Sequence, residues 1–168
     1  NDLKIGGLIG YCDIPINQTP DDVYVYRCSS DLSIKCYENN MPYYTAFGSI
    51  LGQVLYNVKA TILDCYGNVT ADASLGKNGY YTGIIAFVNN IVQPIRIENF
   101  VGSARVNGNK NISASLTRGA YSVIGMSNAN SSTKVPSVTL KNIYAKGEVE
   151  VSGNVYTMYP QCTGSTSN

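Results

Sequence analysis

Two kinds of apolar segment alternate along the chain. The first is short, with glycine or small residues around two aliphatic positions, and occurs at residues 6–11, 48–53, 82–87 and 121–126. The second follows each of these and keeps small or apolar residues at every second position. Its predicted inward positions are Cys28, Ser30, Leu32 and Ile34, then Cys65, Gly67, Val69 and Ala71, then Phe100, Gly102, Ala104 and Val106, and finally Ile143, Ala145, Gly147 and Val149. A period of two residues predicts β-strands that bury one face.

The pair of segments recurs about every 38 residues, which predicts four repeats. We find no helical periodicity of useful length, so each repeat is expected to hold two or three strands. Recurrence of the same positions predicts an all-β protein, a parallel β-helix (β-solenoid) of about four coils that stack about 4.8 Å apart. An antiparallel β-sandwich is the alternative. One domain is expected over residues 1–168, with repeats at about 5–45, 46–79, 80–118 and 119–155 and a C-terminal tail at 156–168.

A polar position precedes the inward positions of the second segment. Asp64, Asn99 and Asn142 occupy it in three of the repeats. Side-chain amides bond to one another along a stack of strands, so this position predicts an Asn ladder at a corner of the coils. Arg27 stands there in the first repeat and interrupts the ladder.

Two stretches resemble a known repeat. Gly-Gly-Leu-Ile-Gly at residues 6–10 and Asn-Ile-Tyr-Ala-Lys-Gly-Glu-Val at residues 142–149 are similar to the two halves of the GLUG repeat. The resemblance covers most of the chain, since residues 50–52 and 123–125 keep the pattern, although Ile85-Ala86 lacks the final glycine. GLUG repeats belong to parallel β-helical surface and adhesin-like proteins. The resemblance implies an exported surface or fibrous protein and brings no catalytic residues.

Charge and histidine content narrow the function. The chain has 12 Lys and Arg against 11 Asp and Glu, for a net charge of +1, and 14% of its residues are charged. This balance argues against a nucleic-acid-binding module, which carries a basic stripe. The chain has no His, which excludes Ser-His-Asp and Cys-His nucleophiles and His-ligated zinc. We therefore expect no enzyme activity and no cofactor.

Carboxylates are the remaining route to hydrolase or lyase chemistry, as in pectate-lyase-like β-helices. The adjacent pairs are Asp21-Asp22, in a turn, and Glu148 with Glu150, on the outward side of the last repeat. Arg105 shares an outward position with Glu148, so the two are expected to form an ion pair between neighbouring strands.

The chain carries signs of export. No stretch approaches 18 uninterrupted apolar residues, so no membrane span is expected. The first residue is Asn1 and no leader pattern follows it, which indicates a processed chain, a fragment or an expression product. Four Asn-x-Ser/Thr sequons predict N-glycosylation at Asn17, Asn68, Asn111 and Asn130. The expected location is outside the cell or on its surface.

The five cysteines contain no CxxC pair, which argues against a zinc or thioredoxin-like site. Cys28 and Cys65 share one inward position in neighbouring repeats, within the Cα separation that a disulfide needs. Two stacked buried thiols are the alternative. Cys12 and Cys36 both lie in the first repeat and are a second candidate pair, which leaves Cys162 free or bonded to another chain.

The first apolar segment has aliphatic residues on both faces. One row is Leu8, Ile50, Ile84 and Val123, the other is Ile9, Leu51, Ile85 and Ile124, and beside the second lie Tyr11, Gln53, Phe87 and Met126. If the first row faces inward, the second faces outward and must be covered by loops or by another chain.

The expected function is that of a non-enzymatic extracellular structural or adhesive subunit, glycosylated and able to pair head to tail into filaments. Its partners would be further copies of itself or the flanking coils of a longer solenoid, and glycans or other cell-surface ligands. The alternative is a polysaccharide-binding or polysaccharide-cleaving β-helix, because Tyr66 and Tyr144 lie at outward positions and suit stacking on sugar rings.

Overall fold

The computed structural model describes residues 3–36, 45–73, 80–89, 91–108, 122–126, 137–151 and 154–158, and it contains no helix within them. Its strands are β1 (Leu3–Gly6), β2 (Ile9–Ile14), β3 (Asp21–Tyr26), β4 (Ser29–Cys36), β5 (Thr45–Tyr56), β6 (Val58–Ala73), β7 (Tyr80–Asn89), β8 (Ile95–Gly108), β9 (Ile124–Met126), β10 (Val138–Val151) and β11 (Asn154–Met158). The protein is therefore all-β in this part of the chain, as the period-two pattern predicts.

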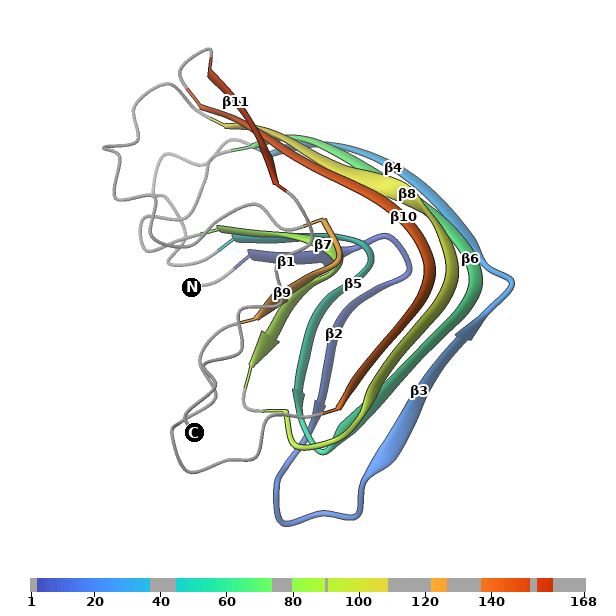
Figure 1. The fold of residues 1–168 in the computed structure, drawn as a ribbon. Helices are drawn as coiled ribbons and strands as arrows, with labels where there is room; N and C mark the ends of the chain where they lie inside the picture. Colours follow the sequence, from blue (N-terminus) through green and yellow to red (C-terminus); the bar gives the residue numbers. More distant parts are fainter. Residues whose placement is uncertain are drawn as a thin grey trace, which may run out of the picture.

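The chain alternates between two sheets. The first sheet has the order β1-β5-β7-β9, with β2 also paired to β5, and the second has the order β11-β10-β8-β6-β3, with β4 also paired to β6. Every described pair is parallel except β10 with β11. In Figure 1 the second sheet forms a curved outer wall and the first sheet lies inside the curve. This parallel pairing differs from the antiparallel β-sandwich that the sequence left open.

The register of the second sheet matches the predicted alignment. Cys65 pairs with Phe100, and Phe100 pairs with Ile143. Val69 and Ala104 pair in the same way further along β6 and β8. We use the word column for positions that pair across successive strands, and the predicted alignment of these columns is confirmed.

The inward columns fill two hydrophobic clusters between the sheets. The larger one includes Ile62, Ile97 and Phe100, with Cys28 and Ile143 packed against it. The smaller one contains Phe47, Val69, Ala71, Ala104 and Val106, with Leu32 and Ile34 packed against it. Phe100 is wholly buried, whereas Asp31 and Lys146, at predicted outward positions, are exposed. The side chain of Val149, another predicted inward position, lies outside the described side chains.

The first sheet bends between the two clusters, and glycine makes the bend possible. A Cβ on Gly48 would lie 1.8 Å from the backbone oxygen of Leu51. No larger residue fits there without moving the backbone. The second sheet approaches the same bend through Gly67, whose added Cβ would lie 3.0 Å from the Ser49 oxygen. Small residues in this column therefore follow from the close approach of the two sheets.

The bend determines which way the two aliphatic rows of the first apolar segment face. Ile50 and Leu51 are neighbours in sequence, yet both are fully buried in the larger cluster, and so are Ile84 and Ile85. The prediction that one row faces outward is wrong, because the register shifts between Gly48 and Leu51 and lets both rows turn toward the core. Gln53 pairs with Phe87 as expected. Met126, however, pairs with Val88, because the register between β7 and β9 shifts between Ile85 and Val88.

Candidate functional site

The second sheet turns a corner at a single column. Arg27, Asp64, Asn99 and Asn142 all have positive φ angles, of 51°, 53°, 53° and 53°. Asn and Asp tolerate this left-handed conformation better than other residues with a side chain, because their short polar groups bond locally. The polar column in the sequence is therefore the backbone corner of the sheet.

The corner side chains form the predicted ladder. Asn142 Nδ2 donates to Asn99 Oδ1 at 2.8 Å, and Asn99 Nδ2 donates to Asp64 Oδ1 at 2.6 Å. At the interrupted end, Arg27 Nε lies 3.9 Å from Asp64 Oδ2. The guanidinium of Arg27 also stacks over the ring of Tyr26, 4.8 Å from its centroid. The ladder thus ends in an exposed ion pair, where the predicted break occurs.

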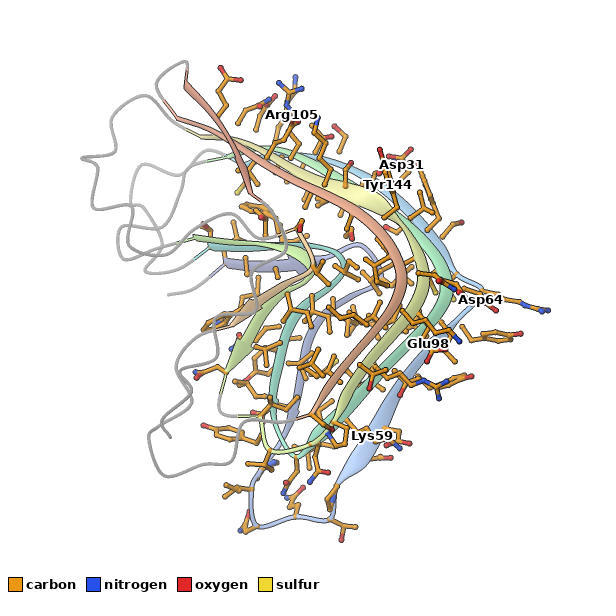
Figure 2. The ribbon with its side chains drawn as sticks, viewed as in Figure 1. Asp31, Lys59, Asp64, Glu98, Arg105 and Tyr144 are labelled. Carbon is orange, nitrogen blue, oxygen red and sulfur yellow. The ribbon has the colours of Figure 1, made fainter. Side chains whose placement is uncertain are left out.

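A mostly apolar column runs along the outer face directly after the corner. It consists of Ser29, Tyr66, Val101 and Tyr144. Tyr66 is 42% exposed, Val101 50% and Tyr144 76%. Figure 2 shows Tyr144, Asp64 and Glu98 on the outer side of the second sheet. The outer face therefore presents two tyrosine rings in one line, separated by one valine.

The next outer columns carry further polar ladders. Asn68 donates to the Tyr66 hydroxyl, and Ser103 Oγ donates to Asn68 Oδ1 at 2.9 Å. Farther along, Asn107 Nδ2 donates to Asp72 Oδ1 at 2.7 Å. The bonds of Ser103 and Asn107 link β8 to β6, whereas the bond from Asn68 lies within β6 and holds the ring of Tyr66 in place.

A shallow hollow lies between the corner column and the outer apolar column. Its lining includes Arg27, Asp64 and Asn99 on one side and Tyr66 and Val101 on the other. Cys28, Ser29 and Cys65 complete the lining. The hollow combines apolar surface with amide, carboxylate and guanidinium groups, a mixture that suits a polar ligand with apolar faces. We call this region, together with Tyr144, the outer corner surface.

Most charged side chains of the outer face are paired. Lys59 Nζ lies 3.2 Å from Asp22 Oδ2, and Arg96 Nε lies 2.9 Å from Glu98 Oε1. The hydrogen bond from Arg96 lowers the pKa of the Glu98 carboxyl, and the same bond raises the pKa of Arg96. In the described part of the chain, no group of three or more Cys, Asp or Glu side chains is placed to hold a metal ion.

The predicted ion pair between Arg105 and Glu148 does not form, because each residue contacts a different partner. The two residues do pair across β8 and β10. However, Glu148 contacts Lys146 on its own strand, with Nζ and Oε1 2.6 Å apart, and Arg105 reaches Glu150 instead, at 3.7 Å. Lys146 competes successfully because side chains two residues apart project from the same face of a strand.

The four described cysteines are free thiols. Cys28 and Cys65 lie in one column, as predicted, but no bond joins them; Cys65 Sγ donates instead to the backbone oxygen of Leu63 at 3.1 Å. Cys12 and Cys36 pack against different clusters, so the second predicted pair does not form either. Burial raises the pKa of the Cys65 thiol, and of the Cys12 thiol as well. The remaining cysteine, Cys162, lies outside the described residues.

The sequons differ in their surroundings. Asn17 is exposed on the turn between β2 and β3. Asn68 lies within β6 on the outer face, part-buried beside Tyr66. Asn111 and Asn130 lie outside the described residues.

One structural residue was missed from the sequence. Asn57, between β5 and β6, donates from Nδ2 to the backbone oxygens of Pro15, Ile16 and Gln18, at 3.1, 2.8 and 2.9 Å. It thereby holds the turn that carries Asn17. The stacking of Arg27 on Tyr26 was likewise not predicted from the sequence. A usable signal was present, because Arg27 interrupts the Asn ladder directly after Tyr24 and Tyr26.

Comparisons with known proteins give no relative. No family model, no curated protein and no solved structure matches the chain. In the described residues, no helix has the length and apolar character needed to cross a bilayer.

Proposed function

We propose that this chain is a non-enzymatic structural or adhesive subunit of the extracellular space or cell surface. In this proposal the two sheets are the walls of a parallel β-helix of about four coils. The coils pair head to tail with those of another copy and so extend into filaments. N-linked glycans decorate the exposed turn at Asn17, the outer face at Asn68, and the sequons at Asn111 and Asn130.

The observation that carries the proposal is the exposure of core columns at both ends of the stack. Leu8, between β1 and β2, is 42% exposed, whereas Ile50, whose backbone oxygen accepts a hydrogen bond from the Leu8 N–H, is fully buried. Leu140, on β10, is 38% exposed, whereas its partner Ile97 is fully buried. Apolar positions that are buried in the middle of the stack are thus partly exposed at its two ends.

Hydrogen-bonding groups are open at the same places. In the described residues, β10 pairs with β11 only over 147–151, so residues 138–146 have a partner strand on one side alone. At the opposite end, the only strand that pairs with β3 or β4 in the described part of the chain is β6. An unpaired strand edge is a template for another strand. A heterologous contact between two such ends continues into a filament when it does not close into a ring.

The test is self-association of the whole chain. We expect sedimentation velocity to show particles that grow with concentration, and electron microscopy to show fibres with an axial repeat of about 19 Å per subunit plus any junction, from four rungs of about 4.8 Å. Leu8→Asp and Leu140→Asp should each reduce the particles to monomers, because a charge would be buried in the junction.

Val101→Asp is the matched control. It adds the same charge on the outer face of a middle strand, so growth should be unchanged if junctions form only at the ends. Wild-type protein that stays monomeric at high concentration would refute end-to-end pairing. Equal disruption by Val101→Asp would refute the location of the junction.

Glycosylation is tested on native material. Peptide mapping after enzymatic deglycosylation in heavy-oxygen water marks each occupied Asn as a labelled Asp. We expect label at Asn17, Asn68, Asn111 and Asn130, with the highest occupancy at Asn17 because it lies on an exposed turn. Unlabelled peptides at all four sequons would remove the glycoprotein part of the proposal.

A further inference from the structure

We infer that the outer corner surface binds an extended neutral polysaccharide along the direction in which the strands are stacked. The inference rests on the adhesive part of the proposed function and is independent of end-to-end pairing. It begins from the two exposed tyrosines. Tyr66 and Tyr144 lie in one column, with Val101 between them.

The tyrosines have the spacing of a linear repeating ligand. Two strand spacings separate their positions, because β8 lies between β6 and β10, which corresponds to about 9.6 Å at a strand spacing of about 4.8 Å. This distance is comparable to the length of a disaccharide in an extended chain. Sugar rings carry C–H groups on their faces, and an aromatic ring that is apolar on its face and polar at its tip packs against them. The two rings can therefore contact alternate sugars of one chain.

The ring of Tyr66 is already held in place. Asn68 donates to its hydroxyl, and Ser103 in turn donates to Asn68. A side chain that is fixed before binding loses less conformational freedom in the complex, which favours affinity. Tyr66 is therefore a prepared platform.

The corner column, which lines the hollow with Arg27, Asp64 and Asn99 and continues to Asn142, supplies groups that can bind hydroxyls. An amide offers two donor protons and an acceptor oxygen, so it serves a sugar hydroxyl in either role. The ladder bonds from Asn99 and Asn142 use one amide proton of each residue. Asp64 and Arg27 add carboxylate oxygens and guanidinium protons at the end of the ladder. The polar groups thus recur from strand to strand, in parallel with the tyrosine column.

Charge favours a neutral polymer. Within the hollow, the one carboxylate and the one guanidinium lie 3.9 Å apart and offset each other. A strongly acidic polysaccharide would find no net positive field here, and a protein partner would need a broader apolar patch than one column provides. The repeating column matches a repeating ligand better than either.

The experiment uses isothermal titration with soluble hexasaccharides of β-1,4-linked glucose, N-acetylglucosamine and xylose, and of α-1,4-linked galacturonic acid. It is run on the wild-type chain and on the Leu140→Asp background, so that a failure of end-to-end pairing does not affect the result. At least one neutral hexasaccharide should bind. Tyr66→Ala and Tyr144→Ala should each weaken binding about tenfold, the loss expected for one aromatic contact.

Tyr24→Ala is the matched control. Tyr24 is an exposed tyrosine on the outer side of β3, outside the column, and its removal should leave affinity unchanged. No binding of any neutral hexasaccharide at millimolar concentration would overturn the inference, as would equal losses in all three variants. Preference for the galacturonic acid oligomer would overturn the neutral ligand class. Reduced self-association in Tyr66→Ala without sugar binding would assign the surface to a second copy of the chain and likewise overturn the inference.

A second arm uses the sequon beside the platform. A glycan on Asn68 would stand next to Tyr66 and compete for the same surface. In protein from glycosylating cells, Thr70→Ala removes the sequon but keeps the Asn68 amide, so it should increase affinity for the hexasaccharide. Unchanged affinity, where mapping shows Asn68 to be occupied in the wild type, would contradict a ligand position over Tyr66.

Discussion

Replacement of Phe100 by alanine tests the register of the whole second sheet. Phe100 is 0% exposed and lies in the larger cluster, in one column with Cys65 and Ile143. Burial of a phenylalanine side chain is worth about 1.5–3 kcal/mol. Phe100→Ala also leaves a cavity, and the total cost of such changes is about 3–5 kcal/mol. We expect the upper half of this range, because β8 is hydrogen-bonded to β6 and β10 on its two sides and cannot collapse into the space.

The measurement is urea-induced unfolding at equilibrium, with the midpoint and the slope fitted separately. The midpoint should fall while the slope stays constant, since the surface exposed on unfolding changes little. Val101→Ala is the control at the next position: it points outward and is 50% exposed, so its cost should stay within about 0.5 kcal/mol. Equal losses from the two variants, or a larger loss from Val101→Ala, would refute the assignment of inward and outward columns.

Three further changes test the bend, the corner and the paired charges. Gly48→Ala should cost at least about 2 kcal/mol in urea unfolding, because its Cβ would lie 1.8 Å from a backbone oxygen, whereas Gly10→Ala, with its nearest atom at 3.3 Å, should cost clearly less. Asn99→Ala should cost about 1–2 kcal/mol, since it forces a residue without a polar side chain into a left-handed conformation; Asn99→Gly should be less damaging, and the reverse order would contradict the corner. Arg96 lowers the pKa of Glu98 in the folded protein, so the contribution of this carboxyl to stability is present above its unfolded pKa and is lost as the pH falls through the lower folded value. Urea unfolding at a series of acidic pH values should show this loss, and Glu98→Gln should remove that part of the pH dependence; an identical profile in the variant would contradict it.

The sequence predicts the second sheet better than the first. A strand with one buried face has a fixed period of two residues, so the alternation of small and polar residues identifies its inward positions. It thereby aligns Cys65 with Phe100 in one inward column. The corner is equally visible, because Asp64 and Asn99 suit a backbone conformation that few residues adopt. The inward columns and the corner together place most of the residues that line the outer hollow. The orientation of Arg27 in that lining depends on the ring of Tyr26, over which it stacks.

The first sheet was harder because its bend depends on tertiary contacts. Ile50 and Leu51 are both buried, and no strict alternation can place two adjacent side chains in one core. The glycine at position 48 signals a close approach, but the oxygen it approaches belongs to the backbone after the bend. The ion pair between Arg105 and Glu150 could not be predicted either, because it depends on the conformations of two long side chains and not on strand register.

The direction of the backbone hydrogen bonds has a mechanical consequence. In the second sheet they run from β3 through β6 and β8 to β10, along the stack and across the strands. A force along β8 loads all the bonds of its two strand pairs together in shear. A force along the stack that is applied at one end of a strand instead opens these bonds one after another, as in unzipping. A filament built from such subunits would therefore resist sliding of its strands more strongly than it resists peeling that starts at one end of a strand.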